Sequence, residues 1–107
     1  MQYEITEKKL RVVLPKELDH HNCMEIKDFI DKVILEGRAD DIIFDFRDTE
    51  FMDSSGIGVI IGRYKLVNSY GGRIYTENET WNIKRIIRVS GLDKILKPYE
   101  KEDGEGK

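Results

Sequence analysis

The feature that most constrains the fold is a short, nearly continuous apolar segment at residues 42–46 (IIFDF). A strand with one face in water alternates apolar and polar residues, and this segment does not. We therefore predict a central strand that is covered on both faces. A polar connection, residues 47–50, separates it from a helical pattern that starts at about Ser54. A buried strand followed by a helix is typical of an α/β fold.

The rest of the chain repeats this alternation. Residues 2–14 contain two strand-like pieces, and a tight turn at Lys8-Lys9 would join them into a leading β-hairpin. The apolar periodicity predicts helices over residues 19–36, 54–70 and 80–90, and a strand over residues 73–76. The resulting order, β-β-α-β-α-β-α, predicts one α/β domain over residues 1–100, with a mixed, mainly parallel sheet packed with helices. Residues 101–107 (KEDGEGK) are predicted to be a disordered charged tail.

Within these elements, three side chains receive specific predictions. Asp19 is expected to cap the first helix, because its carboxylate can accept free backbone N–H groups. Cys23 falls on the apolar stripe of that helix and is expected to be a buried, inert thiol. Trp81 is expected to be a partly buried packing residue. The second helix is expected to turn one apolar face inward, made of Ile57, Ile60, Ile61, Tyr64 and Val67.

Composition excludes several classes of function. The chain has 18 Lys+Arg against 21 Asp+Glu, a formal net charge of −3, so a global grip on nucleic acid or a membrane surface is not expected. One cysteine excludes an internal disulfide framework and a multi-cysteine zinc site. The start of the chain has no basic-then-apolar pattern, and no apolar run approaches the ~20 residues that span a bilayer. We expect a cytoplasmic protein.

The segment that carries chemistry is residues 52–63 (MDSSGIGVIIGR). It follows the central strand and opens the second helix, where open α/β sheets usually bind ligands. A serine there can cap the helix, and a phosphate on it would be tolerated, because free N–H groups and the helix dipole favour an anion. Ordinary capping by Asp53, Ser54 or Ser55 is the plainer interpretation.

The glycines of this segment argue for more than capping. Gly56, Gly58 and Gly62 lie inside a predicted helix, where each costs about 1 kcal/mol relative to alanine. Gly58 and Gly62 are four residues apart and share one face. The close approach of another backbone would explain them, either within the domain or from a partner.

Other chemistries fit less well. The glycine spacing is not that of a dinucleotide site, no lysine completes a phosphate-binding loop, and Ser54 lacks the G-x-S-x-G setting of a hydrolase. Asp19, His20 and His21 could suggest a metal, with Asp45, Asp48 or Asp53 as further ligands, but the chain has only two histidines. Capping or partner contacts are the better interpretation. Lys84, Arg85 and Arg88 form a basic cluster, which we interpret as a solvated helix face.

Residues 51–65 (FMDSSGIGVIIGRYK) closely resemble the phosphorylation-site segment of the anti-sigma factor antagonists of the STAS-domain family. Residues 17–21 (ELDHH) resemble the family's loop before the first helix, and Lys84-Arg85 and residues 90–92 (SGL) resemble its third helix and the turn after it. The resemblance covers about residues 2–99. Together with ELDHH, the DSSG core is most similar to the sporulation members that regulate sigma-F.

The resemblance implies a partner switch without catalysis or a cofactor of its own. The unmodified antagonist would bind an anti-sigma factor that is also a serine kinase, and so release the sigma factor. Phosphorylation of Ser54 would end binding, and a metal-dependent serine phosphatase would restore it. Such a chain is expected to be a monomer when free. The implied partner-binding residues are Asp19, His20, Asp53, Ser54, Ser55, Gly56 and Ile57.

The chain departs from the family pattern before its third helix. Residues 77–81 are more polar than the family's, and Trp81 stands where the family often has proline. Ser55 is a second candidate acceptor one residue from Ser54. Three alternatives stay open: a STAS domain of another partner-switching pathway such as the stress response, a small hydrolase that uses Ser54 or the Asp19–His21 group, and a nucleotide-binding module.

Overall fold

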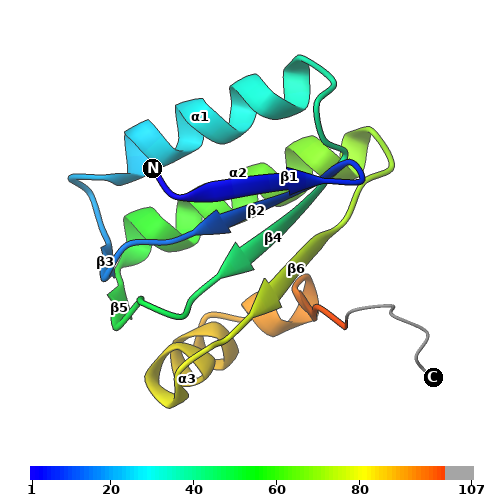
Figure 1. Ribbon diagram of the computed structural model, residues 1–107. Coiled ribbons are helices and arrows are strands. Elements are labelled where there is room, and N and C mark those ends of the chain that lie inside the picture. The colour runs from blue at the N-terminus through cyan, green and yellow to red at the C-terminus, as the bar shows by residue number, and fades with distance from the viewer. Residues whose placement is uncertain (101–107) are drawn as a thin grey trace.

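The computed structural model describes residues 1–100 and confirms the predicted α/β class (Figure 1). The main sheet has the order β1-β2-β4-β6-β7, in which β1 pairs antiparallel with β2 and all other neighbours are parallel. The strands and helices are β1 Tyr3–Thr6, β2 Lys9–Val13, β3 Glu17–Leu18, α1 Cys23–Leu35, β4 Asp41–Asp45, β5 Phe51–Met52, α2 Ser54–Ser69, β6 Ile74–Glu77, α3 Trp81–Val89, the 3₁₀ turn η1 Leu92–Lys94 and β7 Lys97–Pro98. The charged tail predicted over residues 101–107 lies outside the described residues.

The leading hairpin is present, but its turn lies one residue earlier than predicted. Glu7 and Lys8, not Lys8 and Lys9, occupy the turn, with φ angles of 52° and 66°. Two left-handed residues suit a two-residue hairpin, because their twist matches that of the strands. A slip of one residue would turn buried Leu10 and Val12 to the other face of the sheet, so core burial fixes this register.

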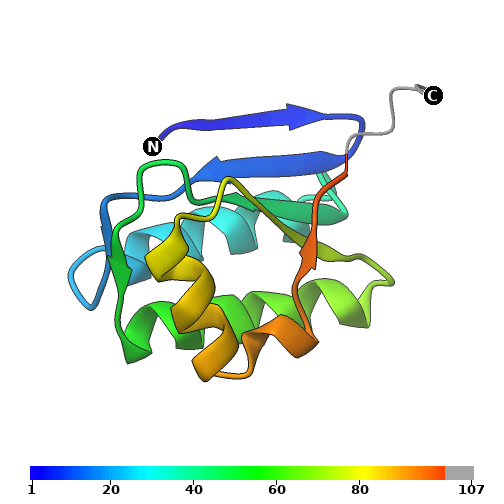
Figure 2. The ribbon, with the colours of Figure 1, turned by 90° about the horizontal axis from the view of Figure 1, so that it is seen from below.

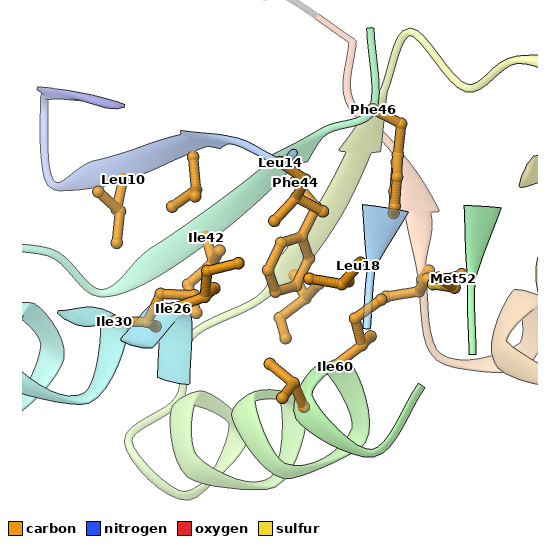
Figure 3. Packing of buried hydrophobic residues seen from close by; sticks show 14 of the residues in the cluster. Leu10, Leu14, Leu18, Ile26, Ile30, Ile42, Phe44, Phe46, Met52 and Ile60 are labelled. Carbon is orange, nitrogen blue, oxygen red and sulfur yellow. The ribbon is translucent and has the colours of Figure 1, made fainter. Parts of the chain in front are cut away.

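All three helices pack on one face of the sheet (Figure 2). Leu10, Ile42 and Phe44 project from β2 and β4 toward Ile30 of α1 and Ile60 of α2 (Figure 3). The predicted apolar stripe of α1 is confirmed, since its buried residues are Cys23, Ile26, Ile30, Val33 and Ile34. A single core therefore holds the helices against the central strands.

The opposite face of β4 is buried without any helix over it in residues 1–100. Ile43 is 2% exposed although it points away from the core. Arg11 and Tyr75 flank it in the sheet register, and the guanidinium of Arg11 lies 5.7 Å from the centre of the Tyr99 ring. The prediction of a strand covered on both faces is thus confirmed for burial, but side chains rather than helices cover the second face.

Asp45, the last residue of β4, is a buried charge in the central strand. It is fully buried, and it accepts hydrogen bonds from the backbone and guanidinium of Arg47 and from Nδ2 of Asn78. Burial alone would raise the pKa of this carboxyl, but these hydrogen bonds and the charge of Arg47 outweigh burial and lower the pKa. Asp45 therefore ties together the connections that follow β4 and β6.

The inward face of α2 differs from the predicted one. The buried residues are Gly56, Val59, Ile60, Arg63 and Val67, whereas Ile57, Ile61 and Tyr64 are only partly buried. The rotation follows from Arg63, whose Nε lies 2.8 Å from Oδ1 of Asp31 on α1. Periodicity assigns an arginine to solvent, so it could not anticipate this interhelical ion pair. Among the described helices, none is long and apolar enough to cross a membrane.

Candidate functional site

A second, two-stranded sheet joins the two segments that the sequence singled out. Strands β3 and β5 pair in parallel, with Glu17 opposite Phe51 and Leu18 opposite Met52. Sequence patterns miss these strands, because two residues are too few to show alternation. The pairing places the loop before α1 beside the first turn of α2, which brings residues 17–22 next to residues 51–56.

Asp53 caps α2 and leaves Ser54 free. Its backbone is extended (φ −98°, ψ −170°), and its Oδ1 accepts hydrogen bonds from the N–H groups of Ser55 (2.8 Å) and Gly56 (3.2 Å). The cap is therefore the aspartate rather than a serine. Ser54, the first residue of α2, is exposed, and its hydroxyl makes no hydrogen bond within residues 1–100. Ser55 is half-buried in the same turn.

Gly56 is the point of close approach. A Cβ at this position would lie 2.6 Å from the carbonyl oxygen of Leu18 and 2.9 Å from its Cγ, so any side chain would collide with β3. The predicted close approach within the domain is thus confirmed for Gly56. It is wrong for Gly58 and Gly62, where a Cβ would meet nothing within 4 Å in the described chain.

The loop before α1 is a separate turn, and Asp19 does not cap the helix. Helix α1 begins at Cys23, with Asn22 as its N-cap and no side-chain hydrogen bond. Asp19 Oδ1 instead accepts from the N–H of His21 at 3.0 Å. Asn22 closes the turn, because its Oδ1 accepts from the Asp19 N–H (3.0 Å) and its Nδ2 donates to the Glu17 carbonyl (2.6 Å). This reciprocal pairing delays the helix by four residues relative to the prediction.

The negative charges of Asp19 and Asp53 both act on the thiol of Cys23. The thiol of Cys23 is buried, as predicted, and its pKa is raised first by burial and then by the negative charges of Asp53 and Asp19. His20 and His21 are exposed, with ring centres 6.2 Å apart. Within residues 1–100, no three His, Cys, Asp or Glu side chains gather as a metal site would need. The corner is acidic, and Ser54 lies in it.

Helix α3 contributes a neighbouring surface. Thr80 caps the helix, because its Oγ1 accepts a hydrogen bond from the Ile83 N–H at 3.2 Å. Trp81 is 77% exposed, so the prediction of a partly buried packing residue is wrong. Ile83 and Ile87 take the inward face of this short helix, and Trp81 falls outside it. Between α2 and α3 lies a groove of about 190 Å³, lined by Ile57, Arg85, Ile86, Val89 and Ser90.

Known proteins match both the sequence and the fold. The family model of the STAS domain matches residues 1–104. The chain is 39% identical to the anti-sigma F factor antagonist of Paenibacillus polymyxa over 93 residues, which are 87% of this chain and 80% of that one. It is 28% identical to the anti-sigma-B factor antagonist of Bacillus subtilis over 98 residues, 92% of this chain and 88% of the other.

Two solved structures of the Bacillus anti-sigma factor antagonist SpoIIAA are also similar. The unphosphorylated form superimposes with a TM-score of 0.82 at 31% identity, covering 95% of this chain and 90% of that one. The phosphorylated form gives a TM-score of 0.75 at 31% identity, covering 95% and 93%.

The chain belongs to the STAS domain family. The resemblance to its anti-sigma factor antagonists, predicted from residues 17–21 and 51–65, is confirmed.

Proposed function

We propose that this protein is an anti-sigma factor antagonist whose unmodified form binds an anti-sigma factor with serine kinase activity and so releases a sigma factor. Phosphorylation of Ser54 ends the binding, and a metal-dependent serine phosphatase restores it. The sigma factor is sigma-F of sporulation. The observation that carries the proposal is the Ser54 hydroxyl at the first residue of α2, which is exposed and makes no hydrogen bond to the described residues 1–100. The cap by Asp53 holds the turn without it.

Charge supplies the physical basis of the switch. A phosphate on Ser54 adds about −1.5 to −2 charges at neutral pH. The carboxylates of Asp53 and Asp19 already make this corner negative. Asp53 also occupies the N–H groups of Ser55 and Gly56 that would otherwise receive an anion. The added charge therefore stays on the binding surface, where it repels an acidic partner group without a change of fold.

The proposal is tested by intact-mass measurement and peptide mapping after incubation with ATP and the anti-sigma F factor of Paenibacillus polymyxa. Wild type should gain one phosphate on Ser54. Ser54→Ala should gain none, and Ser55→Ala, the matched control in the same turn, should be modified like wild type. Addition of a metal-dependent serine phosphatase should return the wild-type mass. Modification at Ser55, or none with an active kinase, would contradict the proposal.

Binding gives an independent test. Ser54→Ala should bind the kinase whether or not ATP is present, because it cannot be switched off. Ser54→Asp should bind poorly, since it places a negative charge at the switch. A Ser54→Asp variant that binds like wild type would contradict the electrostatic explanation.

A second pathway is favoured by one observation, the 28% identity to an anti-sigma-B factor antagonist. Parallel incubation with the anti-sigma-B factor of Bacillus subtilis separates the two pathways by which kinase modifies Ser54. The hydrolase and nucleotide-binding alternatives are tested by turnover of a generic ester or phosphoester and by titration with ATP or GTP. We expect no turnover and no saturable nucleotide binding.

A further inference from the structure

The outer side of α3 exposes apolar surface that the core does not use. Trp81 and Val89 are 77% and 78% exposed, more than any other large hydrophobic side chain in residues 1–100. The guanidinium of Arg85 lies 5.8 Å from the centre of the Trp81 ring. We call Trp81, Lys84, Arg85, Arg88 and Val89 the α3 surface. Aromatic and arginine side chains in this arrangement are enriched where proteins bind one another.

The α3 surface is also a local concentration of positive charge on an acidic chain. Lys84, Arg85 and Arg88 are all exposed, and none lies within 4.0 Å of a carboxylate in the described residues. Some cations elsewhere in the fold do have such partners, such as Arg47 with Asp45 and Arg63 with Asp31. What sets these three charges apart is that they gather on one short helix next to an exposed tryptophan.

The α3 surface is continuous with the turn that carries Ser54. Arg85 and Val89 line the groove between α3 and α2, and Ile57 forms its other wall. Ile57 lies three residues after Ser54 in α2, so the two are neighbours along the helix. A protein that covers Ser54 therefore reaches the groove without leaving this side of the molecule.

We propose that the α3 surface and its groove dock an acidic segment with apolar side chains, belonging to the anti-sigma factor that binds the Ser54 turn. The inference rests on the proposed function and deepens it. An apolar floor with a cationic rim fits such a segment by shape and by charge. Trp81 supplies the apolar anchor, and Arg85 links the anchor to the groove.

Two other occupants fit less well. A second copy of this chain, docked by two-fold symmetry, would bring Lys84, Arg85 and Arg88 against their own copies, and like charges face one another unfavourably. A nucleic acid would meet a chain of net charge −3 outside this small surface. The complementary partner is therefore an acidic protein segment.

The test is the affinity for the anti-sigma F factor of Paenibacillus polymyxa, measured by calorimetry at low and high salt. We expect Trp81→Ala and Arg85→Glu each to weaken binding by about 10-fold or more, and the loss in Arg85→Glu to shrink at high salt. The matched controls are Lys65→Glu, at an exposed position in α2, and Tyr70→Ala, at the exposed residue that follows the helix. They should bind within about 2-fold of wild type. Circular dichroism checks that all four variants fold.

The outcomes are distinct. Loss of affinity in the α3 variants but not the controls supports the docking surface. Wild-type affinity in both α3 variants overturns it, while phosphorylation of Ser54 by the same kinase still upholds the proposed function. Self-association of wild type that Arg85→Glu abolishes in sedimentation overturns it in favour of a second copy, and binding of a single-stranded oligonucleotide at physiological salt overturns it in favour of nucleic acid. If wild type neither binds the kinase nor is modified, both proposals fall.

Discussion

Helices α1 and α2 begin in the same corner of the molecule, and each start is preceded by an aspartate, yet the two starts are built differently. Asp53 lies directly before α2, and its carboxylate holds two N–H groups of the first turn. Asp19 lies four residues before the first residue of α1, and its carboxylate holds a separate turn. The start of α2 is fixed by a side chain, whereas the start of α1 is fixed by backbone and by Asn22.

Backbone conformation decides whether the residue before each helix caps it with its side chain. The cap of α2 is extended, which aims its side chain at the free N–H groups of the helix. The cap of α1, Asn22, has φ −111° and ψ −5°, and makes no such bond with its side chain. Aspartate therefore stabilises the start of a helix at Asp53 and a separate turn at Asp19. The consequence for function is that Ser54 is presented on the more firmly held of the two ends.

The largest expected effect is on the packing of α2 against β3. Gly56→Ala should lower the free energy of unfolding by about 2 kcal/mol or more, because its Cβ would collide with the Leu18 backbone rather than with a movable side chain. Urea denaturation measures the change. Gly62→Ala is the control and should not destabilise the protein, because its Cβ would meet nothing within 4 Å among residues 1–100. Equal destabilisation by both would mean that the β3 contact does not hold α2.

The next largest effect is expected from removing the carboxylates of Asp53 and Asp19. Asp53→Ala should lower the free energy of unfolding by about 1 kcal/mol, the ordinary value of a helix cap, and Asp53→Asn should largely preserve it. Asp19→Ala should cost less, because α1 uses no side-chain cap. Thermal and urea unfolding of the three variants test this order. A larger loss for Asp19→Ala would reverse the comparison.

Much of this architecture could be predicted because the signals are repeated over many residues. The stripe of α1 and the helix from Ser54 follow from apolar periodicity, and the central strand follows from a nearly continuous apolar run. The strands β3 and β5 could not be predicted from the sequence, because two residues are too few to show the apolar–polar alternation of a strand. The rotation of α2 depended on one buried ion pair between Arg63 and Asp31, and periodicity places such a charge outside.

The candidate site, too, could be predicted from the sequence only in part. Asp53, Ser54 and Gly56 were singled out by local chemistry, because a cap, a serine and a costly glycine occur together. Their relation to Asp19 required the β3–β5 pairing, which joins residues 34 positions apart, such as Glu17 and Phe51. The exposure of Trp81 could not be read from the pattern of α3, because an aromatic residue at the edge of an amphipathic face suits either side.

A substitution at Gly58 is expected to have a smaller effect on stability and also tests binding of the anti-sigma factor. Gly58→Ala should stabilise the fold by about 0.5–1 kcal/mol, since alanine favours a helix and its Cβ would meet nothing within 4 Å in the part of the chain that the structure describes. The same variant should bind the anti-sigma factor more weakly if a partner backbone approaches α2 over this glycine. Urea denaturation and calorimetry, run on one preparation, separate the two effects. Gains in both stability and affinity would show that no partner approaches there.

The smallest expected effect is a change in the pKa of Cys23, which reports on the negative charge around Ser54. Cys23 is the first residue of α1, a position that ordinarily lowers a thiol pKa, yet burial and then the charges of Asp53 and Asp19 raise it. Its thiolate absorbance should therefore appear only above the ordinary thiol pKa of about 8.5. Asp53→Asn should lower the pKa, and Asp19→Asn should lower it less, following the order of the two charges.

The thiol pKa also has a consequence for stability. Because the folded protein holds this proton more tightly than the unfolded chain does, the stabilising contribution is complete below the ordinary thiol pKa and is lost as the pH rises above it. Cys23→Ala should remove that part of the alkaline loss of stability, measured by urea denaturation across the same pH range. A phosphate on Ser54 should raise the Cys23 pKa further. An unchanged pKa in Asp53→Asn, Asp19→Asn and the phosphorylated protein would show that the corner is screened, and that the switch must act by steric contact at Ser54 rather than by charge.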